Sequence, residues 1–273
     1  ITEQEAIAAI KEYVTIDGKY KLEHKSLNAY NKYDNADWSF SWSYSDKTIN
    51  KYCSIYASVD AVTGEIKNFN IYDSENETKK PGVAKYNMEQ SRKIAEEFLS
   101  EIQPEKFKTS EYRELYYDYI IKAEDVVNYN FNYIRMVNGI AFPSNTLSVT
   151  VNAYTGKVTN YSVNWKDMMF PEAKDVISLE DAYRLLYAKH DMELKYTRFY
   201  DYDNAANNMS VKLVYMLDNP FGMIDAKTGQ FVDSNGKPVR DAKKQDFIDI
   251  KGHKHEADIQ LLQQMNIINS VSD

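Results

Sequence analysis

The chain has 273 residues, of which 43% are hydrophobic and 27% charged, and its formal net charge is −8. This net charge argues against an extended surface for nucleic acid or an anionic membrane, since both need a dense basic face. No apolar run approaches the roughly 18 residues of a membrane span, and the single cysteine, Cys53, excludes an internal disulfide. We interpret Cys53 as a buried structural thiol, and the length predicts two or three small domains.

Three helices are predicted from their start signals. In each, a residue with a short polar side chain stands three positions before an acidic or amide residue, so that the two side chains can cap free amides of the first turn. Apolar residues then recur at intervals of three and four, which gives the helix one buried face. The three start signals are Thr2-Glu3-Gln4-Glu5, Asn87-Met88-Glu89-Gln90 and Ser178-Leu179-Glu180-Asp181.

A phrase of the form Val/Ile, Asp/Asn, Ala, any residue, Thr, Gly follows each predicted helix. The alternating residues around it and its Thr-Gly pair predict a β-hairpin, with glycine where φ must be positive. Three copies in one chain indicate an internal repeat. The structural residues of these turns are Thr63 and Gly64, Thr155 and Gly156, and Thr228 and Gly229.

The segments between each helix and its hairpin alternate apolar and polar residues, as half-buried strands do. The clearest is the stretch 38–44, whose aromatic residues are expected to face the helix. The sequence therefore predicts an α+β fold of tandem units, each an amphipathic helix packed on a small antiparallel sheet, with a short C-terminal helix. The predicted boundaries are residues 1–85, 86–172 and 173–240 for the three repeats and 245–273 for the tail.

This repeated pattern resembles two related families. A capped helix, a few antiparallel strands and a Thr-Gly hairpin together resemble the PepSY-type module. The longer stretch from Tyr133-Ile134-Arg135 through Trp165 to Phe170-Pro171 is similar to the YcdB/YcdC repeated domain of Gram-positive bacteria. The resemblance covers about residues 1–240 and implies an extracytoplasmic, non-catalytic module. PepSY units occur in protease pro-regions and are thought to restrain peptidases, and the family supplies no catalytic residue.

The tail carries a second resemblance. Residues 247–262 are similar to the opening of an S-layer homology module, with Lys254 where that family has Trp and Asn266 where Gly is common. The chain ends at Asp273, about halfway through such a module. The resemblance implies a secreted protein associated with the cell surface, with cell-wall polymer bound through a complete S-layer homology region outside this chain. We expect the tail to form one helix that, through its apolar stripe of Ile259, Leu262 and Ile267, either docks against the third repeat or pairs with another chain.

Two kinds of cluster could hold a metal ion. Histidines two positions apart, as in the stretch 253–256 near Asp249, point to opposite faces of a strand and lie about 200° apart on a helix, so a solvated helix start is preferred. The acidic stretches 73–77 and 201–204 lack the sixth-position glycine and the terminal glutamate of an EF-hand. No phosphate loop, zinc motif or nucleophile elbow is present. We therefore predict no catalytic residue, no cofactor and no metal site.

The sequence favours a binding module over an enzyme. The expected partner is a peptide or a peptidase segment that adds as a strand to a sheet edge. The 23 tyrosines could also form platforms for peptide or sugar, although filling the sheets is their preferred role. Two alternatives stay open, a structural spacer of a surface-layer protein and a wall-active hydrolase that uses two of the 41 acidic residues. Free strand edges would favour binding, whereas a deep cleft with converging acids would favour the hydrolase.

Overall fold

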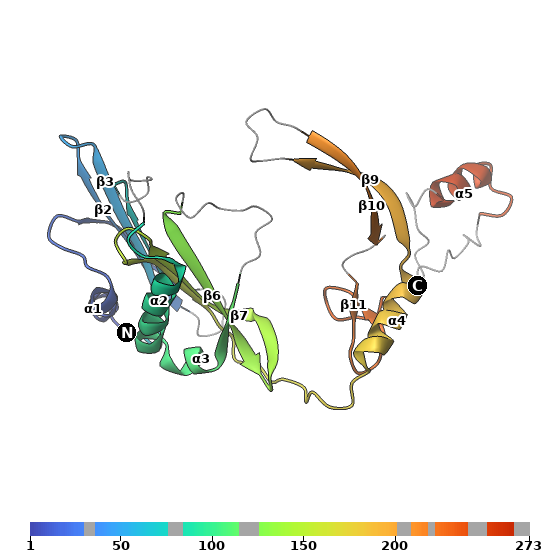
Figure 1. Ribbon diagram of the computed structural model, residues 1–273, viewed down its shortest axis with the longest axis horizontal. Coiled ribbons are helices and arrows are strands. Elements are labelled where there is room, and N and C mark those ends of the chain that lie inside the picture. Colours follow the sequence, from blue (N-terminus) through green and yellow to red (C-terminus); the bar gives the residue numbers. More distant parts are fainter. Residues whose placement is uncertain are drawn as a thin grey trace. The chain divides into compact units, whose positions relative to one another are not determined.

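The fold is α+β and divides into two compact units, Ile1–Pro171 and Glu172–Asp273 (Figure 1). No helix in the described part of the chain is long and apolar enough to cross a membrane. The computed structural model describes residues 1–29, 36–75, 84–114, 126–200, 209–217, 222–239 and 250–264.

The described part of the first unit contains three helices, and the two longer ones start at their predicted caps. The Thr2 hydroxyl accepts the Glu5 amide at 3.3 Å, and the Glu5 carboxylate accepts the Thr2 amide at 2.7 Å. Asn87 and Gln90 make the equivalent bonds at 2.9 and 3.0 Å. The short third helix starts at a proline, which has no amide to leave unsatisfied in the first turn. The helices are α1 (Glu3–Tyr13), α2 (Met88–Ile102) and α3 (Pro104–Lys108).

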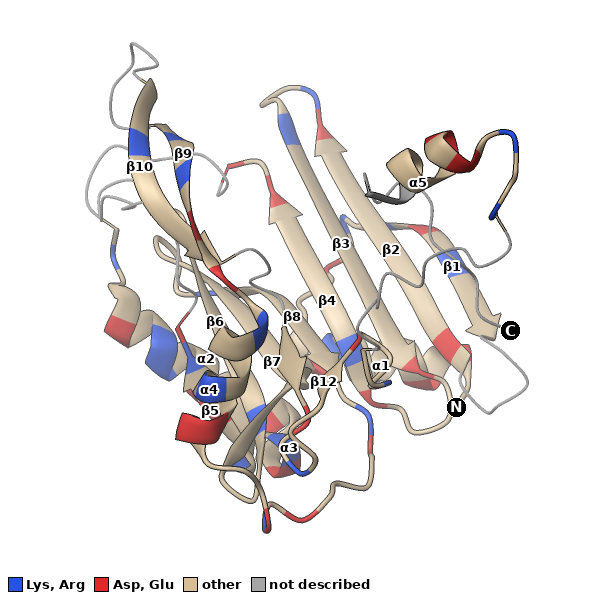
Figure 2. Ribbon diagram, turned by 90° about the vertical axis from the view of Figure 1, so that its right-hand side faces the viewer, with Lys and Arg blue, Asp and Glu red and all other residues tan. Residues whose placement is uncertain are grey.

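Eight strands of the first unit form one antiparallel sheet (Figure 2). Its order is β1-β2-β3-β4-β8-β7-β6-β5, so that each half consists of four strands that are consecutive in the chain. The strands are β1 (Lys21–Ala29), β2 (Ala36–Asp46), β3 (Lys51–Asp60), β4 (Ile66–Asp73), β5 (Ser110–Arg113), β6 (Asn128–Val137), β7 (Ile140–Asn152) and β8 (Val158–Asn164).

The two halves of the sheet meet where β4 pairs with β8. Phe69 lies opposite Tyr161, and each is the fifth residue after the turn glycine of its own half, Gly64 or Gly156. The halves are therefore related by a local two-fold axis at this pair, and Phe98 of α2 contacts both rings, with centroids 5.8 and 5.5 Å apart. The sheets expected for the first two repeats are thus one sheet, because pairing β4 with β8 satisfies main-chain groups that would otherwise form two exposed edges.

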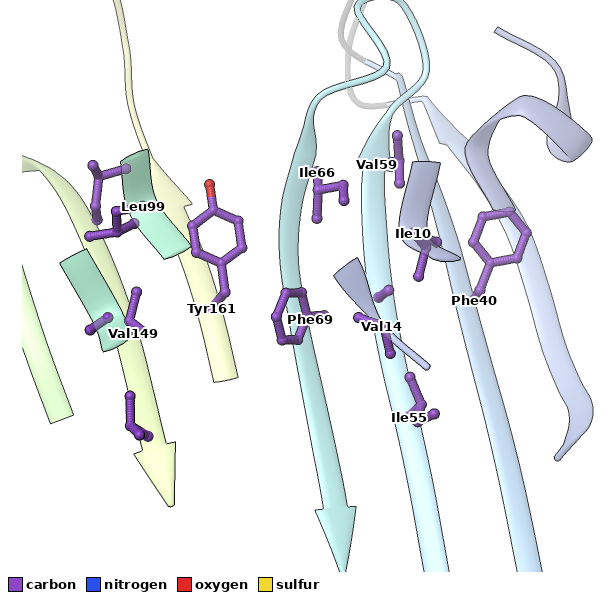
Figure 3. Close-up of a cluster of buried hydrophobic side chains, with 14 of the residues drawn as sticks. Ile10, Val14, Phe40, Ile55, Val59, Ile66, Phe69, Leu99, Val149 and Tyr161 are labelled. Atoms are coloured by element: carbon purple, nitrogen blue, oxygen red, sulfur yellow. The ribbon is translucent and has the colours of Figure 1, made fainter. Parts of the chain in front are cut away.

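The core of the first unit lies between this sheet and its helices. Ala6 and Ile10 of α1, Val14 just after it, and Ala95 and Leu99 of α2 are 0–1% exposed. Full burial of one large apolar side chain contributes about 1.5–3 kcal/mol, so this layer dominates the stability of the unit. The helices pack in a single cluster with residues of both halves of the sheet (Figure 3), among them Phe40, Ile55, Val59, Phe69, Val149 and Tyr161.

The described residues of the second unit begin, like the first half of the first unit, with a helix followed by four strands, but these strands form two separate two-stranded sheets, β9 with β10 and β11 with β12. The Ser178 hydroxyl caps α4 by accepting the Asp181 amide at 3.0 Å. No residue of α4 is buried, so this helix does not form with the sheets of the second unit the closed core that the sequence led us to expect. The elements are α4 (Leu179–Lys189), β9 (Met192–Tyr200), β10 (Met209–Leu217), β11 (Met223–Ile224), β12 (Phe231–Val232) and α5 (Glu256–Gln264).

The Thr-Gly phrase forms the same turn three times. The side chain of Asp60, Asn152 or Asp225 accepts the amides two and three positions later, at 2.8–3.1 Å. The hydroxyl of each turn threonine accepts the amide that follows the glycine, at 3.2–3.3 Å. Positive φ, which a Thr-Gly turn requires, is observed at every turn glycine, with values of 79°, 67° and 69° at Gly64, Gly156 and Gly229.

Each turn also fixes the start of the helix that precedes it in the chain. The main-chain nitrogen of the residue just before the helix cap donates a hydrogen bond to the carbonyl oxygen of the turn alanine. The side chain of the same residue lies near the turn glycine. We call this contact the helix–turn lock. It closes each repeat on itself, because the turn follows the helix by dozens of residues. The three donor–acceptor pairs are Ile1 with Ala61, Tyr86 with Ala153 and Ile177 with Ala226.

Substitution Gly156→Ala should destabilise the first unit by more than backbone strain alone. A Cβ at this position would lie 2.6 Å from the Tyr86 ring. We expect about 1–2 kcal/mol from left-handed geometry and a further 1–3 kcal/mol, roughly, from displacing the ring. Urea unfolding of the variant measures the sum.

Gly139→Ala is the matched control, because its φ is 78° and nothing lies within 4 Å of its Cβ position. Gly139→Ala should therefore lower the free energy of unfolding only by the cost of the left-handed backbone, about 1–2 kcal/mol. Adding Tyr86→Ala to Gly156→Ala should cost less than the sum of the single losses, since no ring remains to be displaced. Equal losses for Gly156→Ala and Gly139→Ala would contradict the packing part of the lock.

Acid should weaken the first turn through Asp60. Burial alone would raise the pKa of this carboxyl, but the amides of Thr63 and Val62 and the charge of Lys67 outweigh burial and hold its pKa below the usual value. The stabilisation is complete above the unfolded pKa of about 3.9 and is lost as the pH falls through the lower folded pKa.

Asp60→Asn keeps an acceptor in the turn, as Asn152 does naturally, but cannot titrate. Urea midpoints of the variant should therefore fall less steeply below about pH 4 than those of the parent chain. Identical slopes would show that the Asp60 carboxylate does not contribute to acid sensitivity.

Candidate functional site

The six turn residues that the sequence singled out lie in three separate turns. Their polar groups bond within the turn, and their glycines accommodate the residue that precedes each helix. They position helices and leave no side chain free to act on a ligand together. The residues are Thr63, Gly64, Thr155, Gly156, Thr228 and Gly229.

Among the described residues, no three His, Cys, Asp or Glu side chains gather as a metal site requires. The rings of His253 and His255 have centroids 5.8 Å apart, and His255 Nδ1 lies 3.2 Å from an Asp258 carboxylate oxygen. The Glu256 carboxylate accepts the Gly252 amide at 2.8 Å, which is a bond of a helix start. Asp249 and the acidic stretch 201–204 lie outside the described residues.

The acidic stretch 73–77 is described as far as Glu75, and a lysine neutralises that part. Lys51 Nζ lies 2.6 Å from the Glu75 carboxylate and 3.5 Å from that of Asp73. The hydrogen bond to Glu75, reinforced by both negative charges, raises the pKa of Lys51 to about 12. An ammonium group therefore lies where these two carboxylates could have met a cation.

Two hollows of about 370 and 600 Å³ adjoin Phe231 in the second unit. One carboxylate, Asp233, lines the smaller hollow, and it accepts the amides of Asn235 and Lys237 at 2.8 and 2.9 Å. No second described acid lines either hollow. Neither hollow therefore offers the pair of converging carboxylates that glycoside hydrolysis uses.

The face of the eight-stranded sheet that carries no helix is polar. Charged residues stand toward the ends of β2, β3 and β4, and their middles are uncharged (Figure 2). Neighbouring side chains bond one another on this face, as in Asn68 to Ser58 at 2.7 Å. Tyr52, Tyr56 and Tyr72 share it and are 39–47% exposed. We interpret it as a solvated face. One row that crosses seven strands contains only Ser and Asn, namely Ser26, Ser39, Ser58, Asn68, Ser162, Ser148 and Asn132.

Large apolar side chains are exposed together on the β9–β10 hairpin. The two nine-residue strands pair in continuous register from Met192 and Leu217 to Tyr200 and Met209. Directly paired residues share a face of the hairpin, and successive residues alternate between faces. Arg198 and nine apolar residues therefore lie on one face, which we call the apolar face. The nine are Met192, Leu194, Tyr196, Tyr200, Met209, Val211, Leu213, Tyr215 and Leu217.

The opposite face of the hairpin is mostly polar. Lys195 pairs with Glu193 at 2.5 Å, and Lys212 Nζ lies 5.2 Å from the centre of the Phe199 ring. This division into an apolar and a polar face is typical of a sheet with one side buried. On this hairpin, however, all of the nine apolar residues except Leu217 are 50–80% exposed. The apolar face therefore has the composition of a buried contact surface, although most of its side chains are exposed.

The hairpin also has an open strand edge. In chain order β10 corresponds to β2, and β11 corresponds to β3, which pairs with β2 along ten residues. β11 has two residues and pairs with β12, so β10 pairs with β9 alone among the described strands. Edge strand β1 of the first unit differs, because it carries a bulge between Leu22 and His24 and exposed lysines, which discourage strand addition.

Both strands of the hairpin can be predicted from the sequence, but the exposure of their apolar face cannot. The alternation of residues 194–200 and 209–217 predicts half-buried strands, and it does not show that their apolar side lacks a cover. The available signal was the short distance between Gly222 and Asp225. A glycine three residues before the turn leaves room for a strand of only two residues, whereas β3 and β7 have ten and thirteen.

These features define an α+β protein with one eight-stranded antiparallel sheet in its first unit, three turns of the same kind, and an exposed hairpin in its second unit. The chain belongs to the family of the YcdB, YcdC repeated domain, whose model matches residues 3–165. That range contains the eight-stranded sheet, and it includes neither the hairpin nor the tail from residue 245.

Among solved structures, the chain is similar to the Bacillus megaterium YpeB C-terminal domain. The two share 16% sequence identity with a TM-score of 0.48, over 85% of this chain and 95% of that chain. No curated protein matches the sequence.

Proposed function

We propose that the chain is a non-catalytic, polypeptide-binding module that works outside the cytoplasm. The observation that carries the proposal is the β9–β10 hairpin, which combines an exposed apolar face with an open edge on β10. Nine-residue edges without bulges or proline are sites where another chain can pair. Membership of the YcdB, YcdC family and the resemblance to PepSY-type modules support a binding role rather than catalysis.

The ligand is an extended segment that adds to β10 as an antiparallel strand. Its main chain would bond to the open edge whatever its sequence, and alternate side chains would extend the apolar face and provide selectivity. In the first unit, β3 takes this place beside β2, with small or branched side chains on the buried side. The ligand should therefore have such residues at every second position, as β3 has Cys53, Ile55, Ala57 and Val59.

The proposed biological partner is a segment of a peptidase, by analogy with PepSY units that restrain proteases. The proposed location is the cell surface or cell wall, and it rests on the resemblance of residues 247–262 to an S-layer homology module. In that arrangement a complete wall-binding region outside these residues would hold the chain at the wall. The hairpin would then present its edge to polypeptides in the surrounding space.

A synthetic peptide with the sequence of residues 51–60, carrying valine in place of Cys53, tests strand addition. Labelled with a fluorophore and titrated with the full chain, it should bind with a measurable rise in anisotropy. Hydrogen exchange should then slow at β10 amides and stay unchanged at β1. A peptide with the same composition, in which the alternation is scrambled, should bind at least about tenfold more weakly.

Backbone methylation of the peptide provides the control. Amides of successive strand residues point to opposite sides, so only one alternating set faces β10. Methylating that set should abolish binding, and methylating the other set should leave it intact. Equal binding by both methylated peptides, or slower exchange at β1 rather than β10, would contradict strand addition at this edge.

A further inference from the structure

The apolar face of the hairpin is too large to be an incidental surface. Eight of its side chains are at least half exposed, and together they present roughly 1,000 Å² of largely apolar area, given about 150–250 Å² for a whole aromatic side chain. The largest apolar patch of a monomer is ordinarily about 300–600 Å². A stable interface buries about 800 Å² on each partner. One copy of this face therefore supplies the area that a dimer needs.

We infer that the apolar face of β9–β10 packs against the same face of a second copy of the chain. The two hairpins stack as a small β-sandwich about 10 Å thick, with their polar faces outward. This contact uses the face of the hairpin, so the two copies can join whether or not a strand adds to the edge of β10.

The single charge on the face determines how the copies are oriented. Arg198 lies near the tip of the hairpin, opposite Val211, and Arg198 Nη1 lies 3.9 Å from Met209 Sδ. Stacking tip on tip would bring the two arginines together in an apolar layer, which is costly. Stacking tip on base separates them and places Tyr196 and Leu213, the central pair, on the two-fold axis. The geometry therefore selects the tip-to-base dimer, an isologous contact.

A second copy fits this face better than a lipid surface does. Both outer edges of the hairpin carry main-chain groups without strand partners among the described residues. Those groups would stay unsatisfied in hydrocarbon, whereas face-to-face stacking leaves them in water. The face also carries no acid and one base, so charge selects neither an acidic nor a basic partner surface.

Sedimentation velocity of the full chain, from about 5 to 200 μM, tests the dimer. The parent chain should shift from monomer to dimer over this range. Leu213→Lys places two lysines against each other at the axis and should weaken the dimer by at least about 100-fold. Ser210→Lys adds the same charge on the other face of β10 and should leave the dimer unchanged. Far-UV circular dichroism establishes that both variants keep the fold.

Four results would overturn the inference. The first is a parent chain that stays monomeric throughout, as it would if its own helix α4 covered the face. The second is a dimer that Leu213→Lys leaves intact, which would place the contact elsewhere. The third is flotation of the chain with vesicles of neutral or anionic phosphatidyl lipids, abolished by Leu213→Lys, when no dimer forms. Val211→Thr keeps strand propensity and should also weaken the dimer. The fourth result is a dimer that Val211→Thr leaves unweakened.

Discussion

The helix–turn lock is the contact on which the rest of the fold depends. A main-chain bond from Tyr86 to Ala153, or from its counterparts in the other repeats, joins a helix start to a turn that is distant in sequence. One such bond is worth only about 1 kcal/mol net. Its effect is geometric, because it determines where the helix begins relative to the strands on either side of the turn. The apolar stripe of the helix can then lie on the sheet, where burial supplies most of the stability.

The same lock has two different outcomes in this chain, and the length of the flanking strands decides between them. In the first unit the strands around both turns are long, so they build a sheet that the helices cover and that joins through Phe69 and Tyr161. In the second unit the corresponding strands have two residues each. The lock still forms, but among the described strands β9 and β10 have no neighbour like β3, and their apolar face is exposed. The proposed binding surface therefore lies on a hairpin that no described strand of its own chain extends into a larger sheet.

The features that could be predicted from the sequence are those whose bonds are local. Helix caps join residues three apart, and the turn of Asp60 and Gly64 is encoded within five residues. Both can therefore be recognised in a short stretch of sequence. The pairing of β4 with β8 is not, because it is a main-chain contact between repeats. Its only sequence trace is an aromatic residue at the same distance from each glycine, Phe69 and Tyr161.

The candidate site escaped prediction for a related reason. The alternation of apolar and polar residues indicates that one side of residues 192–200 and 209–217 is apolar. It does not indicate what lies against that side. Whether that side is buried depends on the elements that lie next to the strands. In the first unit, helices cover the equivalent strands, and they do so on a sheet that includes the long strands β3 and β4. The positive φ values of the turn glycines, by contrast, followed from residue type alone.

Native-state hydrogen exchange of the full chain tests most directly whether the lock is an independent element. The amides to follow are those of Tyr86, whose helix is buried, and Ile177, whose helix has no buried residue. We expect both amides to exchange at least about 100-fold more slowly than an unstructured amide. Protection at Tyr86 with free exchange at Ile177 would contradict it, because the lock would then be a product of the packed core rather than the contact that positions the helix.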